Sequence, residues 1–88
     1  MLYHGTVADF LPSILANGLT KQSRHHVHLS ADAKTATKVG SRRGKPIILT
    51  IRAREMSAAG HQFFRSANGV WLTESVPVLY LDVPNQLQ

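Results

Sequence analysis

The stretch Ile47-Ile48-Leu49-Thr50-Ile51 is the strongest strand signal in this chain of 88 residues. It is almost continuously apolar, which is typical of a strand buried on both faces. Gly44 and Pro46 come just before it, and these residue types end a helix rather than continue one. We therefore expect a buried strand over residues 47–51 and a helix that ends shortly before it.

Two helices are expected on the N-terminal side of this strand. In the first, Asp9 acts as the N-cap, and Pro12 lies in the first turn, where its missing N–H costs little. That helix reaches about Asn17, and Gly18 supplies the left-handed stop. The residues expected to face the core from it are Phe10, Ile14 and Leu15.

The second helix is expected from Ala31 to about Ser41, with Ser30 at the N-cap position. It carries small residues, which would let it lie close against a sheet or a ligand. These are Ala33, Ala36, Thr37 and Gly40.

Short strands are expected over residues 2–4, 26–29, 62–65, 70–73 and 78–83 in addition to the central one. Asn68-Gly69, between two of these segments, is a hairpin signal. The sequence thus predicts about six short strands and two short helices in one domain of residues 1–88, with the helices early and the strands late. This order favours an α+β fold. The polar tail after Pro84 is expected to fray.

Composition describes an ordinary globular chain, with 43% hydrophobic and 17% charged residues. No apolar run approaches membrane-spanning length, and no signal peptide is visible, so no membrane association is expected. The sequence contains no cysteine, which excludes a disulfide scaffold and thiolate metal sites. This composition fits a reducing cytoplasm, where we expect the protein to reside as a monomer.

The chain is basic, with ten Lys and Arg against five Asp and Glu and a formal charge of +5. The basic residues concentrate between Lys34 and Arg54, where no acidic residue occurs. They are Lys34, Lys38, Arg42, Arg43, Lys45, Arg52 and Arg54. Such a cluster indicates a polyanionic partner, such as nucleic acid or a phosphorylated ligand, although a basic domain can also be merely soluble.

Several common kinds of site are disfavoured. The histidines at positions 4, 25, 26 and 28 lack the cysteines and nearby acids of a typical zinc site, so no metal is expected. The acids are spread out, and Asp9 and Asp32 look like helix-start residues. No nucleophile elbow, GxGxxG or Walker loop is present. Gly5, directly after a strand, could let a ligand such as a carboxamide approach the backbone.

Separated blocks of the sequence resemble, in order, the RNA 2′-phosphotransferase family. They are Arg24-His25-His26-Val27-His28-Leu29-Ser30, Val39-Gly40-Ser41-Arg42-Arg43-Gly44-Lys45-Pro46 and Ser66-Ala67-Asn68-Gly69-Val70-Trp71-Leu72-Thr73. The resemblance runs from Leu2 to about Leu81. Leu2-Tyr3-His4-Gly5-Thr6, Ile14-Leu15-Ala16-Asn17-Gly18-Leu19 and His26-Val27-His28-Leu29-Ser30 also resemble the ADP-ribosyltransferase fold of the poly(ADP-ribose) polymerase type. The implied architecture is its split β-sheet.

The resemblance implies a reaction that removes an internal 2′-phosphate from RNA, as left at a tRNA splice junction, with NAD as acceptor. The phosphate attacks C1″ of the NAD ribose and expels nicotinamide. The ribose 2″-hydroxyl then attacks phosphorus, which releases RNA and ADP-ribose 1″,2″-cyclic phosphate. Because nicotinamide is a built-in leaving group, the protein mainly orients the reactants and stabilises charge.

The resemblance also assigns cofactor-binding residues. His4 would hold the adenosine-side ribose of NAD, and the Gly5 backbone, with Thr6 alongside, would grip the nicotinamide carboxamide. His28 takes the second position of the fold's three-position pattern, and Val70 takes the third. An apolar third residue suits a phosphate nucleophile, which is already ionised and needs no general base.

Phosphate-binding residues follow from the second block. Arg42 matches the family's catalytic arginine for the transferred phosphate, with Arg43 and Lys45 as further RNA or phosphate ligands. Arg43 stands where many relatives have His. The winged-helix-like N-terminal RNA lobe of the family, which supplies further phosphate ligands, has no counterpart in these residues. We therefore expect an NAD-binding lobe with weak or no phosphotransfer alone.

Two alternatives remain open from the sequence. One is an ADP-ribosyltransferase that modifies terminal phosphates of nucleic acid and leaves the ADP-ribose attached. The other is a non-catalytic RNA-binding module that uses the basic segment. Against the latter, few aromatics are available for base stacking, and Phe63, Phe64 and Trp71 are expected in the core.

Overall fold

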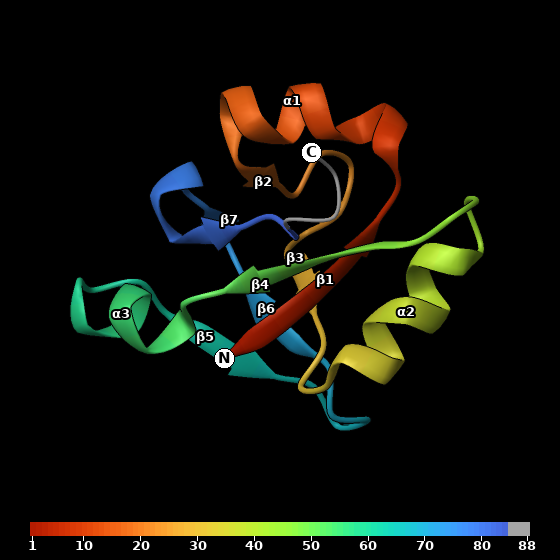
Figure 1. The fold of residues 1–88 in the computed structure, drawn as a ribbon. Coiled ribbons are helices and arrows are strands. Elements are labelled where there is room, and N and C mark those ends of the chain that lie inside the picture. The colour runs from red at the N-terminus through yellow and green to blue at the C-terminus, as the bar shows by residue number, and fades with distance from the viewer. Residues whose placement is uncertain (85–88) are drawn as a thin grey trace.

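The computed structural model describes residues 1–84, and the expected fraying of the tail lies outside them. At the centre, β1 (Leu2–Thr6) pairs antiparallel with β4 (Ile47–Ile51), which also pairs with β8 (Leu81–Asp82) (Figure 1). The central strand is confirmed at its expected bounds. Its burial is one-sided, however, because its odd-numbered residues are buried and Ile48 and Thr50 are half-buried.

A second antiparallel sheet has the order β3 (Val27–Leu29), β6 (Trp71–Thr73) and β5 (Phe63–Arg65). The expected hairpin joins β5 and β6. Its register aligns His28, Leu72 and Phe64 across the three strands, and aligns Leu29, Trp71 and Arg65 in the next row. Because successive side chains alternate, these two rows lie on opposite faces of the sheet.

The two sheets meet where Tyr3 and Ser30 form an antiparallel bridge. The Tyr3 N–H donates to the Ser30 carbonyl at 2.9 Å, and the Ser30 N–H donates to the Tyr3 carbonyl at 2.8 Å. His4 therefore follows directly after the point at which β1 touches the end of β3. This junction positions the candidate site described below.

The first helix differs from the expectation. A 3₁₀ turn, η1 (Ala8–Phe10), precedes α1 (Leu11–Asn17), and no side-chain hydrogen bond caps either one, so the role expected for Asp9 is wrong. The tighter turn changes which residues face inward. Ile14 is buried as expected, but Phe10 and Leu15 are 43% and 50% exposed. Gly18 ends the helix at φ 74°, as expected.

The second helix, α2 (Ala33–Ser41), starts two residues later than expected. Asp32, not Ser30, is its N-cap: Asp32 Oδ1 accepts the Thr35 N–H at 2.7 Å. The hydrogen bonds from Thr35 lower the pKa of Asp32. Ser30 is unavailable as a cap because its backbone is committed to the bridge with Tyr3.

Four further elements were not expected from the sequence. They are α3 (Ala53–Ala58), the paired strands β2 (Leu19–Thr20) and β7 (Ser75–Val76), and the 3₁₀ turn η2 (Val78–Tyr80). The turn takes the first half of the strand expected over 78–83, so that strand shrinks to β8. Residues 1–84 thus contain eight short strands and three α-helices in an α+β arrangement.

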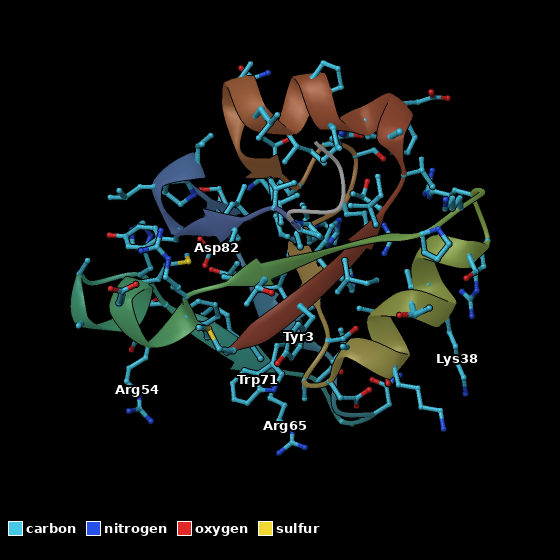
Figure 2. All side chains as sticks on the ribbon, viewed as in Figure 1. Tyr3, Lys38, Arg54, Arg65, Trp71 and Asp82 are labelled. Carbon is cyan, nitrogen blue, oxygen red and sulfur yellow. The ribbon has the colours of Figure 1, made fainter. Side chains whose placement is uncertain are left out.

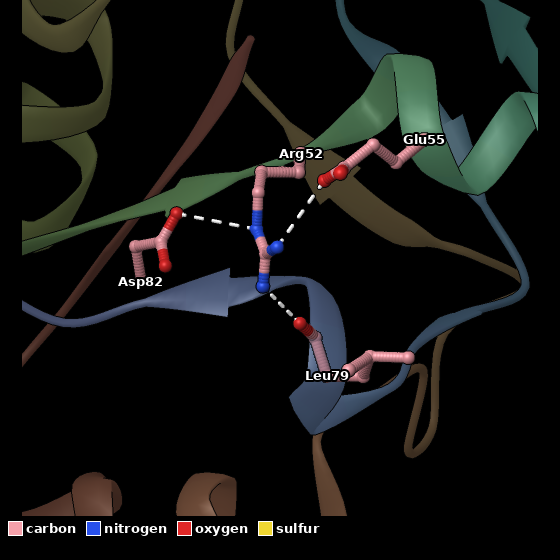
Figure 3. A network of polar contacts seen from close by, with 4 residues as sticks. All are labelled: Arg52, Glu55, Leu79 and Asp82. Atoms are coloured by element: carbon pink, nitrogen blue, oxygen red, sulfur yellow. Dashed lines mark hydrogen bonds and ion pairs between the residues drawn. The ribbon is translucent and has the colours of Figure 1, made fainter.

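Arg52 ties the end of β4 to three other elements (Figure 3). Its Nη1 lies 3.2 Å from Glu55 Oε2 of α3, and its Nε lies 3.4 Å from Asp82 Oδ2 of β8. Its guanidinium also donates to the Leu79 carbonyl of η2. The buried Nε lies within ion-pair distance of Asp82 but makes no hydrogen bond. Arg52 is therefore a structural residue, and we do not count it among the basic residues that could bind a ligand.

The core lies between the two sheets and their helices. Its residues with the least exposure are Leu29, Leu49, Ile51, Met56 and Val76. Phe63 and Trp71 pack partly against it, as expected, whereas Phe64 is 51% exposed. Among the described residues, no helix is long and apolar enough to cross a membrane.

Candidate functional site

His4 on β1 is the best-defined polar side chain at the junction of the two sheets. Its Nδ1 lies 3.1 Å from the backbone carbonyl of His28. A carbonyl oxygen can only accept, so Nδ1 carries the proton and Nε2 keeps its lone pair. Burial lowers the pKa of His4, the hydrogen bond to His28 opposes this, and the charges of His28 and Arg43 lower it further. The ring therefore offers an acceptor near neutral pH.

The exposed ring of His28 on β3 offers the opposite group. Its Nδ1 lies 3.2 Å from Nη1 of Arg24. A guanidinium has donors only, so the Nδ1 of His28 must accept, and the neutral ring carries its proton on Nε2. The two histidines thus present one acceptor and one donor from neighbouring segments. Hydroxyl and carboxamide groups can use such a pair, because they both donate and accept.

The packing of α2 against β1 explains why position 5 is a glycine. A Cβ at Gly5 would lie 1.9 Å from the Ala36 carbonyl oxygen and 2.9 Å from the Gly40 nitrogen, both in the backbone of α2. Gly40 packs reciprocally, since its Cβ would lie 3.2 Å from the carbonyl carbon of Gly5. The glycine therefore lets α2 lie directly on β1, beside His4. Thr6, the next residue, is buried.

Val70 is half-buried and lies just before β6, two positions from Leu72, the Cα partner of His28. Its backbone closes the hairpin loop: the Val70 N–H donates to Ser66 Oγ at 3.1 Å, and the Ser66 N–H donates to the Val70 carbonyl at 2.8 Å. The pairing of β3 with β6 therefore brings Val70, the residue just before β6, near the strand that carries His28.

The expected phosphate-binding residues all lie in one exposed segment. Arg42 caps the C-terminal end of α2, and Arg43 and Lys45 follow it. The Arg43 guanidinium lies 5.6 Å from the centre of the Phe10 ring, a cation–π contact between the loop and η1. The charge of Arg43 also contributes to the lowered pKa of His4, so this arginine lies within electrostatic reach of that histidine.

Sequence reasoning missed Arg24 and Phe10 as parts of this site. Arg24 opens the first family-like block, but nothing in its spacing indicates a contact with His28 across an irregular loop. Phe10 was expected in the core because a continuous helix was assumed through it. Among residues 1–84, no group of three metal-ligating side chains comes together.

Comparison with known proteins shows which protein family the chain resembles. Residues 1–75 match the family model described as RNA 2′-phosphotransferase, Tpt1/KptA family. A protein of Rhodopirellula baltica named "Probable RNA 2′-phosphotransferase" is 61% identical over 83 residues, which are 94% of this chain and 45% of that protein. Proteins of the same name from Streptomyces coelicolor and Pseudomonas aeruginosa are each 57% identical, over 94% and 92% of this chain and 46% and 44% of their own lengths.

The chain thus spans about half the length of the curated relatives that it matches. The matched region includes every candidate site residue named above, from His4 to Val70. By its sequence from residue 1 to residue 75, this chain belongs to the RNA 2′-phosphotransferase family.

Proposed function

We propose that this chain is the NAD-binding part of an RNA 2′-phosphotransferase, with an ADP-ribosyltransferase-like fold. The observation that carries the proposal is the histidine pair at the junction of two sheets: His4 Nδ1 contacts the His28 carbonyl and Arg24 contacts His28 Nδ1. These contacts leave His4 Nε2 as an acceptor and His28 Nε2–H as a donor for a ligand. NAD presents ribose hydroxyls and a carboxamide, which are groups that such a pair can bind. Family membership supports the same assignment.

Within this proposal, the residues position the reactants. His4 accepts a hydrogen bond from a ribose hydroxyl of the adenosine side, and the backbone at Gly5 and Thr6 contacts the carboxamide. His28 and Val70 line the nicotinamide end. NAD supplies an electrophilic ribose carbon whose leaving group is nicotinamide, so these residues orient and do not need to act as bases.

The phosphate of the RNA is assigned to the basic segment that follows α2. Arg42 contacts the transferred phosphate as the catalytic residue, and Arg43 and Lys45 hold neighbouring phosphates through charge-assisted hydrogen bonds. The exposure of all three supports this role. We further propose that efficient transfer needs additional phosphate ligands from the remainder of a full-length relative, because the relatives are about twice as long as this chain. The cysteine-free sequence fits a cytoplasmic location.

Calorimetric titration with NAD tests the proposal. His4→Ala and His28→Ala are each expected to weaken NAD binding by about tenfold, the cost of one or two hydrogen bonds. His25→Ala is the matched control, because His25 is an exposed histidine three residues before His28. If His4→Ala and His25→Ala titrate alike while both remain folded by circular dichroism, the NAD site is not at the histidine pair.

A further inference from the structure

The row Leu29, Trp71 and Arg65 of the second sheet begins in the core at Leu29 and reaches the surface at Arg65. Trp71 is half-buried, and the Arg65 guanidinium lies 5.7 Å from the centre of its indole ring. Both side chains project from the β5–β6 hairpin at the lower edge of the molecule in Figure 2. Strand alternation turns this row away from His28 and Leu72.

Two hollows flank this edge. One, of about 560 Å³, is largely apolar; Leu2, Ala53, Phe63 and Trp71 line it, together with Met1 and Arg54. The other, of about 510 Å³, is polar and is formed by Arg65 and the loop residues Ser66 to Gly69. Trp71 and Arg65 are thus in contact with each other, and each also lines one of the two hollows.

The charge of this edge is uniformly positive. Among the described residues, no Asp or Glu lines either hollow. The acid next to Arg54 in the sequence, Glu55, is paired with Arg52. Arg54 and Arg65 are both exposed, and Figure 2 shows their side chains extending outward from the hairpin and from α3.

We propose that this edge, defined by Arg54, Arg65 and Trp71, binds single-stranded RNA. A base occupies the apolar hollow against the indole of Trp71, while Arg54 and Arg65 hold the phosphates on either side. Stacking on an aromatic ring combined with arginine contacts to the backbone is how single strands are held without sequence preference. An acidic peptide would use the two arginines but would have no planar group for the hollow beside Trp71.

This inference goes beyond the proposed function, because it requires neither NAD nor a 2′-phosphate. It assigns RNA to a surface separate from the histidine pair and from the segment that follows α2. If NAD does not bind at the histidine pair, the proposed RNA surface is unaffected. If RNA does not bind at the Trp71 edge, the proposed NAD site is unaffected.

The test uses the full chain and a short oligouridylate that carries no 2′-phosphate. Trp71 is the single tryptophan of the sequence, so its fluorescence reports directly on this surface. We expect saturable quenching that weakens as salt is raised. Arg54→Glu/Arg65→Glu is expected to weaken binding by about tenfold or more and to reduce the salt slope by roughly 1.4, two phosphate contacts at about 0.7 each. Arg54→Gln/Arg65→Gln is expected to give an intermediate loss.

The matched control is Lys34→Glu/Lys38→Glu, the same charge change at two exposed lysines of α2. It is expected to keep the quenching of Trp71 and most of the affinity. Three results would overturn the proposal: equal losses in the two reversed variants, RNA binding with no change in Trp71 emission, or competition by polyglutamate as effective as by the oligonucleotide.

Discussion

The two faces of the short strand β6 carry different chemistry although they are built from alternate residues. On one face, Leu72 lies between His28 and Phe64, close to the donor–acceptor pair of histidines. On the other, Trp71 lies between buried Leu29 and exposed Arg65, beside two hollows that no Asp or Glu of residues 1–84 lines. Successive side chains of a strand point to opposite faces, so three residues of β6 are enough to separate the histidine pair from the edge that carries Trp71 and Arg65.

The two regions also depend on the fold in different ways. The histidine pair rests on close backbone packing, with α2 lying directly on β1 at Gly5. The Trp71 edge rests on a hairpin whose loop is closed locally by Ser66 and Val70. Disturbing α2 should therefore damage the first region far more than the second.

The largest effect is expected from Gly5→Val. Its side chain would start 1.9 Å from the Ala36 carbonyl oxygen, so α2 must move away from β1. We expect a loss of about 3 kcal/mol or more in the free energy of unfolding in urea. Gly60→Ala is the control, because nothing lies within 4 Å of its Cβ and only its positive φ of 101° costs energy, about 1–2 kcal/mol. Equal losses in the two variants would mean that α2 does not pack on β1 as described.

A smaller loss of stability, about 1–3 kcal/mol, is expected from Arg52→Gln. The variant loses the ion pairs with Glu55 and Asp82 and the bond to the Leu79 carbonyl. Because Arg52 serves the fold, RNA binding by the folded variant should keep its salt slope. Arg54→Gln should show the reverse pattern, with little change in stability and a smaller salt slope. An unchanged urea midpoint for Arg52→Gln would contradict the structural role of this arginine.

Arg24→Ala is expected to act on the tautomer of His28. Without the guanidinium at Nδ1, the neutral ring can place its proton on either nitrogen. The nitrogen chemical shifts of His28 should move from those of the Nε2–H form toward those of a mixture of the two tautomers. The affinity for NAD should fall by a factor of about three to ten. Arg24→Lys keeps a donor and should restore part of both. If the His28 shifts of Arg24→Ala match those of the original chain, Arg24 does not hold this ring.

The smallest effect concerns the pH dependence of stability. Burial lowers the pKa of His4 in the folded chain, while the unfolded chain titrates at about 6.5. Below that value the unfolded chain gains a proton that the folded chain resists. The free energy of unfolding should therefore fall as the pH decreases through 6.5, until the lower pKa of the folded state is passed. His4→Gln should flatten this part of the profile of the free energy of unfolding against pH.

A second window of acid sensitivity belongs to Asp32. Its pKa is lowered by the hydrogen bonds from Thr35, so the stability that this cap contributes is lost at more acidic pH, below the ordinary range of a carboxyl group. The His4→Gln variant removes the histidine effect and so separates it from the effect of Asp32.

Sequence patterns identified the elements with strong local signals. The apolar run at Ile47–Ile51, the hairpin around Asn68-Gly69 and the stop at Gly18 are all confirmed. The predictions fail where a contact between segments distant in the sequence determines the local structure. Ser30 cannot cap α2 because it bridges to Tyr3, and Asp32 takes its place. The short pair β2–β7 depends on segments more than 50 residues apart, which no local pattern signals.

In the candidate site, too, some residues could be identified from the sequence and others only from the structure. His4 and His28 were identified from the family-like blocks, and the structure brings them within one hydrogen bond of each other. Arg24 and the contact of Arg43 with Phe10 depend on loop geometry and were not foreseen. The exposure of Phe64 also contradicts the expectation that the aromatic residues of the hairpin lie in the core, whereas Phe63 and Trp71 do pack partly against it.

The most direct measurement is an NMR titration of the ¹⁵N-histidine-labelled chain with NAD, observing the ring nitrogens. The account predicts that the Nε2 resonances of His4 and His28 shift together and saturate, while those of His25 and His61 stay in place. Shifts confined to other histidines, or none for His4 and His28 at saturating NAD, would contradict it.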